Sequence, residues 1–250
     1  MPAPLYVYGI VEAEGPTLDL PEGVARATPS VHACGRVAAI VSRFAGGEPT
    51  GRPTDVKAHE QVLRAVLEGR NTVLPVRFGS VYPDAAALDR ELLAPRATEL
   101  ETLLTEYADA VELELRVLYP NLDGLLRELV DGDPTLARLS RKARQSGSYH
   151  AQIELGEATV AAFEQRRLAD RALVRDRLTP LVRDWRERDE LPERVAGQFA
   201  FLVERSSLSE FEETAERLAE EVHERLRLRL LGPLPPYSFV SFELEPAGAR

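Results

Sequence analysis

The side chains of this chain that could bind a metal or attack a substrate belong to four histidines and a single cysteine. His32 and Cys34 are two residues apart, which places both on the same face of a strand. A zinc site needs three or four such ligands, and no second close pair accompanies this one, so no metal site is predicted. One hypothesis is that Cys34 is a nucleophile with a remote histidine as its base. We favour a buried, apolar-like cysteine, because nothing in the sequence marks the thiol as activated.

His59 and Glu60 form a second candidate site together with Arg77. His59 shares an apolar helix face with Val62 and Val66, so it is expected at the edge of the core. Arg77 lies in a short apolar segment, where a guanidinium group needs an acidic partner or a bound anion. We interpret the three residues as a structural polar cluster, with an ion pair from Arg77 to Glu60. The alternative is a small-ligand-binding or enzymatic site that uses the same three side chains.

A glycine-rich loop at residues 46–53 has the outer spacing of a phosphate-binding P-loop. Arg52 stands where that motif has its lysine, and Pro53 stands where it has a metal-binding hydroxyl. Proline also has no backbone N–H to donate to a phosphate. We therefore interpret this segment as a surface loop, and the sequence predicts no catalytic residue and no cofactor-binding residue.

Four bases lie within seven residues of one expected helix: Arg138, Arg141, Lys142 and Arg144. The first three share a face, because residues three and four apart are neighbours on a helix. This face is the best candidate in the sequence for contact with an acidic surface of a partner. A solvated helix face without a partner is the alternative.

The composition of the chain argues against several classes of protein. The 250 residues include 31 bases and 41 acids, which gives a formal net charge of −10 and argues against a nucleic-acid-binding protein. No apolar run reaches the length of about 18 residues that a membrane span needs. The first residues lack the pattern of a signal peptide. With 44% apolar residues, we expect a folded cytoplasmic protein.

The first part of the chain alternates short strands with helical stretches. The expected strands are Leu5–Val11, Val31–Cys34, Arg36–Phe44, Val73–Val81 and Val111–Tyr119, and the expected helices are Asp55–Glu68 and a longer one that opens at Asp84. Pro75 lacks a backbone donor, which favours an edge or a bulge for its strand. The pattern predicts an antiparallel sheet with two helices in a domain of residues 1–110.

The second part is richer in helix. The expected helices are Leu122–Val130, one capped by Asp133 and ended by Gly147, Gly156–Trp185, and one from a capping box at Ser209 to Gly232-Pro233. The expected strands are Gln198–Glu204 and Tyr237–Leu244. Together with Val111–Tyr119, these elements predict a helix-rich, ferredoxin-like variant in a domain of residues 111–250. The fold class is thus α+β with two domains.

Four linear motifs carry the strongest signal. They are Leu5-Tyr-Val-Tyr-Gly-Ile-Val11, His59-Glu60, Val73-Leu-Pro-Val-Arg-Phe-Gly79 with Ser80-Val-Tyr-Pro83, and Gly232-Pro-Leu-Pro-Pro-Tyr-Ser-Phe-Val240. In this order and spacing the chain resembles the gas vesicle protein GvpL/GvpF family, from Leu5 to about Phe242. The third and fourth motifs are specific when they occur together.

The resemblance implies a non-enzymatic accessory protein of gas vesicles, which are hollow, gas-filled, protein-walled organelles that give cells buoyancy. Family members are two-domain α+β proteins that take part in assembly. They are thought to bind the small hydrophobic shell protein and other accessory proteins, and to associate with the gas-facing side of the vesicle. A soluble acidic protein could cover an apolar face of a shell subunit through an exposed strand edge or a helix groove. The strand with Pro75 and the strand Tyr237–Leu244 are the possible edges.

Overall fold

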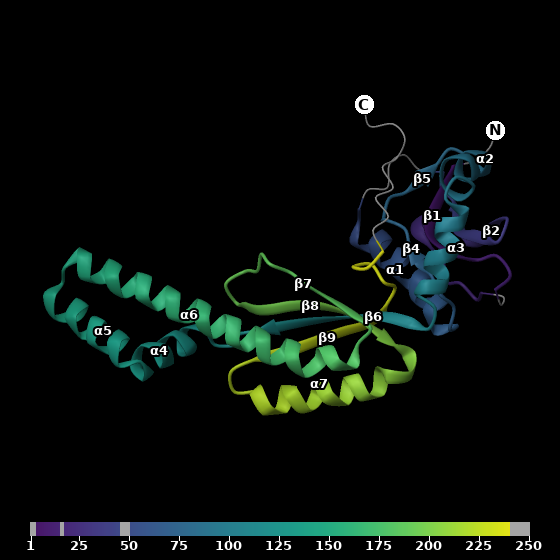
Figure 1. Ribbon diagram of the computed structural model, residues 1–250. Coiled ribbons are helices and arrows are strands. Elements are labelled where there is room, and N and C mark those ends of the chain that lie inside the picture. Colours follow the sequence, from purple (N-terminus) through teal and green to yellow (C-terminus); the bar gives the residue numbers. More distant parts are fainter. Residues whose placement is uncertain (1–3, 16–17, 46–50, 241–250) are drawn as a thin grey trace. The chain divides into compact units, whose positions relative to one another are not determined.

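The computed structural model of the chain describes residues 4–15, 18–45 and 51–240 and divides into two compact units (Figure 1). Unit 1 runs up to Leu113 and takes in the described residues from Gly232 onward, and unit 2 comprises Glu114–Leu231. The sequence predicts a boundary after residue 110 and assigns all later residues to the second domain. No periodicity in the sequence indicates that the segment from Gly232 belongs to the first unit.

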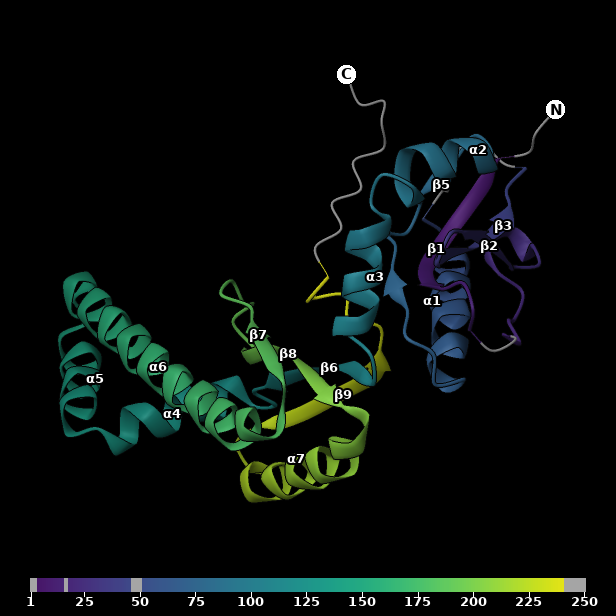
Figure 2. The same cartoon turned by 45° about the vertical axis from the view of Figure 1, so that its right-hand side comes forward.

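Unit 1 is built on an antiparallel sheet, whose described strands number five, with β1 at its centre (Figure 2). The strands are β1 (Leu5–Glu12), β2 (Ser30–Cys34), β3 (Val37–Arg43), β4 (Leu74–Pro75) and β5 (Val81–Tyr82). Their order is β2-β3-β1-β4, and β5 pairs with β1 as well. Pro75 therefore lies at an edge, as its missing donor predicts. The single strand expected over Val73–Val81 is wrong, because the chain turns at Gly79, which has a φ of 94°.

The central strand β1 is buried on both of its faces. Its pairing with β3 shifts between Val7 and Gly9, so Tyr8 is the extra residue of a β-bulge. Tyr6 and Tyr8 are both completely buried. The rings of both tyrosines contact the same residue of the first helix, His59. The bulge thus accompanies a close aromatic contact between the sheet and that helix.

The helices of unit 1 follow the expected periodicity. They are the 3-10 helix η1 (Val24–Arg26), α1 (Pro53–Glu68), α2 (Ala85–Leu88), the π-helix η2 (Asp89–Leu93) and α3 (Ala97–Glu106). α1 begins at Pro53, where the missing N–H of proline costs nothing. Asp84 caps α2 by accepting a hydrogen bond from the Ala87 N–H at 2.8 Å. Pro95 falls between η2 and α3, so the long helix expected from Asp84 is interrupted there.

The sheet of unit 2 has the strand order of a ferredoxin-like fold. Its strands are β6 (Ala110–Leu118), β7 (Asp184–Glu187), β8 (Val195–Glu204) and β9 (Arg227–Leu234), in the order β7-β8-β6-β9. Helices connect β6 to β7 and β8 to β9, whereas β7 and β8 form an antiparallel pair. This connectivity is strand–helix–strand–strand–helix–strand. The expected α+β class and ferredoxin-like variant are confirmed.

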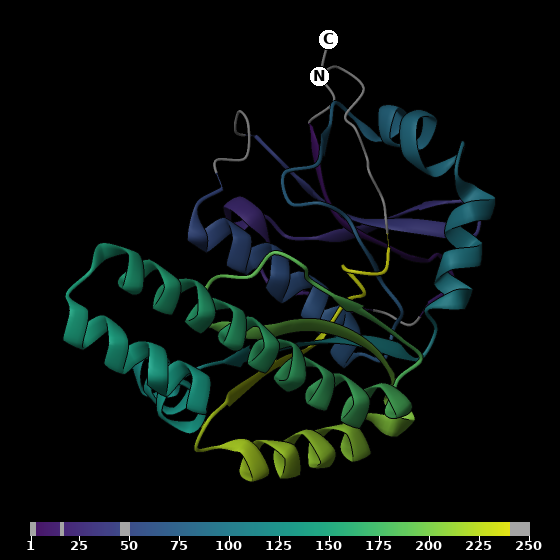
Figure 3. The ribbon, with the colours of Figure 1, turned by 60° about the vertical axis from the view of Figure 1, so that its left-hand side comes forward.

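One long helix, α6, dominates the helical part of unit 2. The helices are α4 (Leu122–Gly132), α5 (Pro134–Ser146), α6 (Tyr149–Leu178), the 3-10 helices η3 (Thr179–Leu181) and η4 (Arg205–Ser207), and α7 (Leu208–Val222). α6 and α7 lie side by side against the sheet, and α4 and α5 lie along the N-terminal half of α6 beyond the sheet (Figures 1 and 3). Asp133 caps α5, and Gly147 ends it in the left-handed conformation, as expected.

The helix expected over Gly156–Trp185 is wrong at both ends. α6 starts earlier, at Tyr149, and ends at Leu178. Pro180 lies just beyond its end, in the short turn of η3, because proline cannot continue the hydrogen-bond pattern of the helix. Trp185 belongs to β7, a four-residue strand at the edge of the sheet. Three of its four residues are charged, so β7 has no apolar alternation that the sequence could reveal.

Three further expectations near the C-terminus differ from the structure. The helix expected from Ser209 to Gly232 ends at Val222, because leucine and arginine then alternate and form β9. Its expected capping box does not form: α7 follows Ser207, whose side chain makes no capping hydrogen bond to a described residue. The strand expected over Tyr237–Leu244 is a series of turns as far as residue 240, and its remainder lies outside the described ranges.

Replacing Gly9 by alanine is expected to destabilise unit 1. The added Cβ would lie 2.7 Å from Val73 Cγ2, 2.8 Å from Leu63 Cδ2 and 2.9 Å from the Leu74 carbonyl oxygen. We expect a loss of about 1–3 kcal/mol in the free energy of unfolding, measured by urea denaturation. The control is Gly132→Ala, where no described atom other than those of its chain neighbours and the nearby helix backbone lies within 4 Å of the added Cβ, and the expected change is below about 0.5 kcal/mol. Equal stability of the two variants would show that β1 is not packed this closely.

Candidate functional site

Motif residues from three separate segments meet in a buried group of rings in unit 1. Tyr6 and Tyr8 come from β1, His59 comes from α1, and Phe78 comes from the turn between β4 and β5. The His59 ring stacks on Tyr8 with centroids 5.5 Å apart and meets Tyr6 and Phe78 edge-on, at 5.7 Å each. Edge-on and offset contacts of this kind are the favourable ones between rings. These four residues are termed the Tyr–His cluster.

Both hydroxyls of the Tyr–His cluster are hydrogen-bonded although they are buried. The Tyr6 hydroxyl lies 2.9 Å from Nδ1 of the cluster's histidine and accepts a hydrogen bond from the Gly79 N–H at 3.2 Å. The Tyr8 hydroxyl lies 2.9 Å from Ser42 Oγ and accepts a hydrogen bond from the Val24 N–H at 2.8 Å. Burial raises the pKa of both tyrosines, so they stay neutral. The bonds tie β1 to α1, η1, β3 and the β4–β5 turn.

The cluster also keeps His59 neutral. The residue is 2% exposed, and burial lowers its pKa to about 4, against a smaller opposing effect of the Val76 backbone. Because the Tyr6 hydroxyl has its own proton to donate, the neutral ring accepts it at Nδ1 and carries the ring proton on Nε2. Nε2 has no hydrogen-bond partner among the described residues. A ring buried this deeply contributes to packing and is out of reach of a substrate.

Glu60 and Arg77 lie outside this buried group. Both residues are exposed, and the ion pairs of the described residues include none between them. Arg77 follows β4 in a turn, where its carbonyl accepts hydrogen bonds from the Ser80 hydroxyl at 2.8 Å and the Ser80 N–H at 3.3 Å. Its guanidinium group therefore reaches solvent and needs no buried partner. The structure brings only His59, of the three candidate residues, into the cluster.

The C-terminal motif returns the chain to unit 1, where a buried carboxylate holds it. Glu112 is completely buried and accepts hydrogen bonds from the Ser238 N–H at 2.7 Å and from the Ser238 hydroxyl at 2.6 Å. The Tyr107 hydroxyl donates to the Phe239 carbonyl at 3.1 Å. Residues 235–240 are therefore fastened to the end of α3 and the start of β6, and they are termed the C-terminal strap.

His32 and Cys34, both on β2, lie near Asp89. His32 Nε2 is 2.8 Å from Asp89 Oδ1. Burial and the Asp89 carboxylate raise the pKa of the Cys34 thiol, which lowers its thiolate fraction and its nucleophilicity. Within the described ranges, no three His, Cys, Asp or Glu side chains are grouped as a metal ion would require. The described surroundings of Cys34 thus give it no activation.

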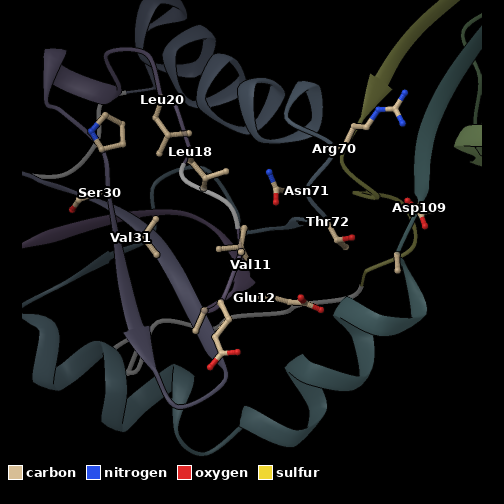
Figure 4. A pocket seen from close by; sticks show the side chains of 15 residues that line it. Val11, Glu12, Leu18, Leu20, Ser30, Val31, Arg70, Asn71, Thr72 and Asp109 are labelled. Atoms are coloured by element: carbon tan, nitrogen blue, oxygen red, sulfur yellow. The ribbon is translucent and has the colours of Figure 1, made fainter.

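A surface pocket of about 550 Å³ opens in unit 1 beside the end of β1 and the start of β2 (Figure 4). Leu18 and Leu20 lie on one side of it, and Arg70 and Asp109 lie on another. None of the site residues that the sequence predicts lines this pocket. Its charged groups are mostly acidic, so it is not suited to hold an anion.

The four bases predicted for partner contact are on α5, and all are exposed. Lys142 Nζ lies 2.7 Å from Glu154 Oε2 of α6. Arg138 is close enough to lower the pKa of the same Glu154, although Lys142 has the larger effect. Arg141 and Arg144 form no ion pair with any described residue. Two of the four guanidinium or ammonium groups thus have no internal partner in the described structure.

The sequence did not reveal a buried carboxylate in unit 2, Asp170 of α6. Asp170 is 2% exposed. It accepts a hydrogen bond from the Tyr119 hydroxyl at 3.1 Å, lies 2.9 Å from Arg225 Nη2 and lies 3.5 Å from Arg166 Nε. A buried charge with two cationic partners is a structural ion-pair network. The sequence signal for this carboxylate is weak, since Asp170 precedes the buried Val174 by one helical turn but follows two arginines, Arg166 and Arg167.

Comparison with known proteins shows what this chain resembles. The family model described as gas vesicle synthesis protein GvpL/GvpF matches residues 4–241. Gas vesicle protein F of Streptomyces sp. (strain CB03234) is 33% identical over 240 residues, which cover 94% of this chain and 98% of that protein. Gas vesicle protein F2 of Halobacterium salinarum is 29% identical over 243 residues, which cover 96% of this chain and 93% of that protein.

Two solved structures share the fold. The crystal structure of the gas vesicle protein GvpF from Anabaena sp. PCC7120 superposes with a TM-score of 0.83 at 23% identity, over 95% of this chain and 98% of that chain. The crystal structure of GvpF from Microcystis aeruginosa superposes with a TM-score of 0.81 at 22% identity, over the same shares of the two chains. At these identities the likeness establishes the fold.

The lowered pKa of His59 predicts an acid-sensitive stability. The pKa is about 4 in the folded protein and about 6.5 in the unfolded chain, so the unfolded chain binds the proton first as the pH falls. The neutral His59 ring therefore makes its full contribution to the free energy of unfolding above about pH 6.5. Up to about 3 kcal/mol of that free energy is lost as the pH falls from about 6.5 to 4. In His59→Gln this part of the loss is expected to disappear, as measured by urea denaturation at a series of pH values.

His150→Gln is the matched control for this experiment, because His150 is an exposed histidine of α6. It is expected to keep the pH dependence of the parent protein. If His59→Gln and the parent protein lost stability alike over this pH range, His59 would not be a buried neutral ring.

Removing the Glu112 carboxylate is expected to loosen the C-terminal strap. In Glu112→Ala both donors of Ser238 lose their acceptor, which should cost about 2–3 kcal/mol in the free energy of unfolding. Ser238→Ala keeps the backbone hydrogen bond and should cost about 1 kcal/mol. Mass spectrometry should also detect faster hydrogen exchange of residues 235–240 in Glu112→Ala. Unchanged exchange of the strap in that variant would mean that Glu112 does not hold it.

Proposed function

Because the chain belongs to the gas vesicle protein GvpL/GvpF family, we propose that it is a non-enzymatic accessory protein of gas vesicle assembly. The proposal is carried by the family match over residues 4–241, together with relatives that are themselves gas vesicle proteins. Its role is to bind the small hydrophobic shell protein and other accessory proteins while the vesicle wall is built.

The positions of the motif residues support a role without catalysis. Tyr6, Tyr8 and His59 are at most 2% exposed, and their polar groups other than His59 Nε2 bond to one another or to the surrounding backbone and Ser42. A small-ligand site at His59 would need an open path to the ring and a nearby charge. The residues by which the family is identified therefore build the scaffold, and contact with partners is left to other surfaces.

The basic face of α5 supports contact with a partner protein. In a chain with a net charge of −10, four exposed bases within seven residues form a local positive surface. Arg141 and Arg144 have no ion pair with a described residue, so acidic side chains of a partner could pair with them. We assign this face to the binding of the shell protein or of another accessory protein.

The place of action follows from the same proposal. A shell subunit with an exposed apolar face would aggregate before it is incorporated, unless another protein covers that face. None of the described helices is both long and apolar enough to cross a membrane. We propose that the protein acts in the cytoplasm during assembly and associates with the gas-facing side of the vesicle.

Co-expression with the shell protein of the same genome tests the proposed function. In a pull-down the tagged protein is expected to retain the shell protein. A variant with Arg138, Arg141 and Arg144 all changed to Glu is expected to retain at least about fivefold less, because attraction is replaced by repulsion. Lys142 is left in place, since its ion pair with Glu154 joins α5 to α6.

The matched control changes three other exposed arginines of unit 2 to Glu: Arg188, Arg194 and Arg229. It carries the same change in charge and is expected to retain as much shell protein as the parent. If both variants retained the same amount of shell protein, α5 would not be the contact surface. If the parent retained neither the shell protein nor any other gas vesicle protein, the proposed function itself would be contradicted.

A further inference from the structure

The long helix α6 carries an apolar stripe of which only one half is covered. Residues three or four apart run along one side of the helix, where Arg167 and Asp170 interrupt the apolar stripe: Tyr149, Ile153, Gly156, Val160, Phe163, Arg167, Asp170, Val174 and Leu178. In the C-terminal half, Val174 and Leu178 are completely buried where α6 packs on β8. In the N-terminal half, Tyr149 is 78% exposed and Val160 is 61% exposed. The same side of the helix thus packs on the sheet at one end and meets solvent at the other.

A mostly apolar groove of about 410 Å³ lies beside the open half of the stripe, within unit 2. Its apolar side chains come from both helices: Leu122 and Leu126 of α4, and Leu155, Val160 and Phe163 of α6. Gly156 also lines the groove, and apart from its chain neighbours and the nearby backbone of α6, no described atom lies within 4 Å of the place where its Cβ would be. The backbone of α6 can therefore be approached closely at this point. Such a surface suits the apolar side of another helix.

Two acidic residues at the border of this surface are unpaired, whereas the base nearest the groove, Arg167, lies 6.0 Å from the Phe163 ring centroid and forms an ion pair with Glu164. Glu193 lines the groove, and Glu157 is exposed on α6 beside the stripe. Neither carboxylate forms an ion pair or a hydrogen bond with another residue of the described ranges. By contrast, Glu154 of the same helix is paired with Lys142. Two unpaired carboxylates beside an apolar surface favour a partner that brings its own bases.

We propose that the α4–α6 groove and the open half of the stripe bind an amphipathic helix of a partner protein, with an apolar side bordered by lysine or arginine. The apolar side chains of that helix fill the groove and the hollow at Gly156, and its bases pair with Glu157 and Glu193. This goes beyond the function proposed above, because it defines a second surface whose chemistry is opposite to that of the basic face of α5.

Two other occupants fit the charges less well. Packing the surface against the same surface of a second copy would bring Glu157 and Glu193 of both copies together, and like charges in an interface are costly. The chain's own residues 241–250 contain two glutamates and one arginine, so they would also add negative charge. A basic amphipathic helix is the occupant that the apolar stripe and the carboxylates favour together.

A synthetic peptide tests this proposal. The probe has about 14 residues, with leucines at helical spacing, lysines elsewhere and a fluorescent label. Fluorescence anisotropy is expected to show saturable binding to the parent protein and at least about tenfold weaker binding to Val160→Asp. A second peptide, with glutamates in place of the lysines, is expected to bind the parent at least about tenfold more weakly than the first.

Leu168→Asp is the matched control variant. Leu168 is also on α6 and is 60% exposed, against 61% for Val160, but it lies off the stripe. Both variants add the same side chain and the same charge to the same helix, so only the position differs. Leu168→Asp is expected to bind the lysine peptide within about twofold of the parent. Glu157→Lys is expected to weaken binding of the lysine peptide and to strengthen binding of the glutamate peptide.

Three outcomes would overturn the proposal. The first is equal binding of the lysine peptide to Val160→Asp and Leu168→Asp, and the second is no binding to the parent protein. The third is self-association of the parent in analytical ultracentrifugation that Val160→Asp abolishes, which would assign the surface to a second copy. None of these measurements uses the shell protein, so they fail or succeed independently of the pull-down that tests the proposed function.

Discussion

The hydrogen bond between the Tyr6 hydroxyl and His59 Nδ1 is the contact on which unit 1 depends. A buried phenol and a buried imidazole each destabilise a core unless they find a partner, and here each provides one for the other at 2.9 Å. The rings around this bond come from β1, α1 and the β4–β5 turn, so one cluster fixes three segments that are distant in sequence. The motifs that identify the family therefore specify the fold of unit 1, and their side chains are enclosed by it.

In unit 2 the long helix α6 is longer than the sheet on which it packs, and this difference in length determines which surfaces of the unit are exposed. α6 has 30 residues and spans about 45 Å, whereas the ten-residue strand β8 spans about 33 Å. The helix therefore extends past the sheet that covers its apolar stripe. α4 and α5 cover part of the extended half, and the remaining part of the stripe stays open beside the α4–α6 groove. This arrangement gives the ferredoxin-like unit two helical surfaces, one basic and one apolar with an acidic border, that its sheet could not supply.

Local patterns in the sequence predict the elements that have strong periodicity and miss those that depend on distant contacts. The helix expected over Asp55–Glu68 and the strand expected over Val111–Tyr119 are present as α1 and β6, because both have one clearly apolar face. The sequence does not predict the edge strands β7 and β9. Both are rich in charged residues, and the sequence pattern assigns them to the ends of the neighbouring helices. For the candidate site, the position of His59 in the core could be predicted from its helix face. The partner of His59, Tyr6, could not be predicted. Tertiary packing of β1 on α1 decides which side chain of the strand meets the histidine, and spacing in the sequence does not show this.

We propose that unit 1 provides the scaffold and that partners bind the helices of unit 2. Hydrogen exchange of the protein alone, compared with its co-expressed complex with the shell protein, tests this claim most directly. We expect slower exchange of residues 134–163, which include α5 and the open half of α6, and unchanged exchange of residues 53–82 around the Tyr–His cluster. Slower exchange of residues 53–82 with no change in α5 and α6 would contradict the claim, because the family motifs would then form the binding surface themselves.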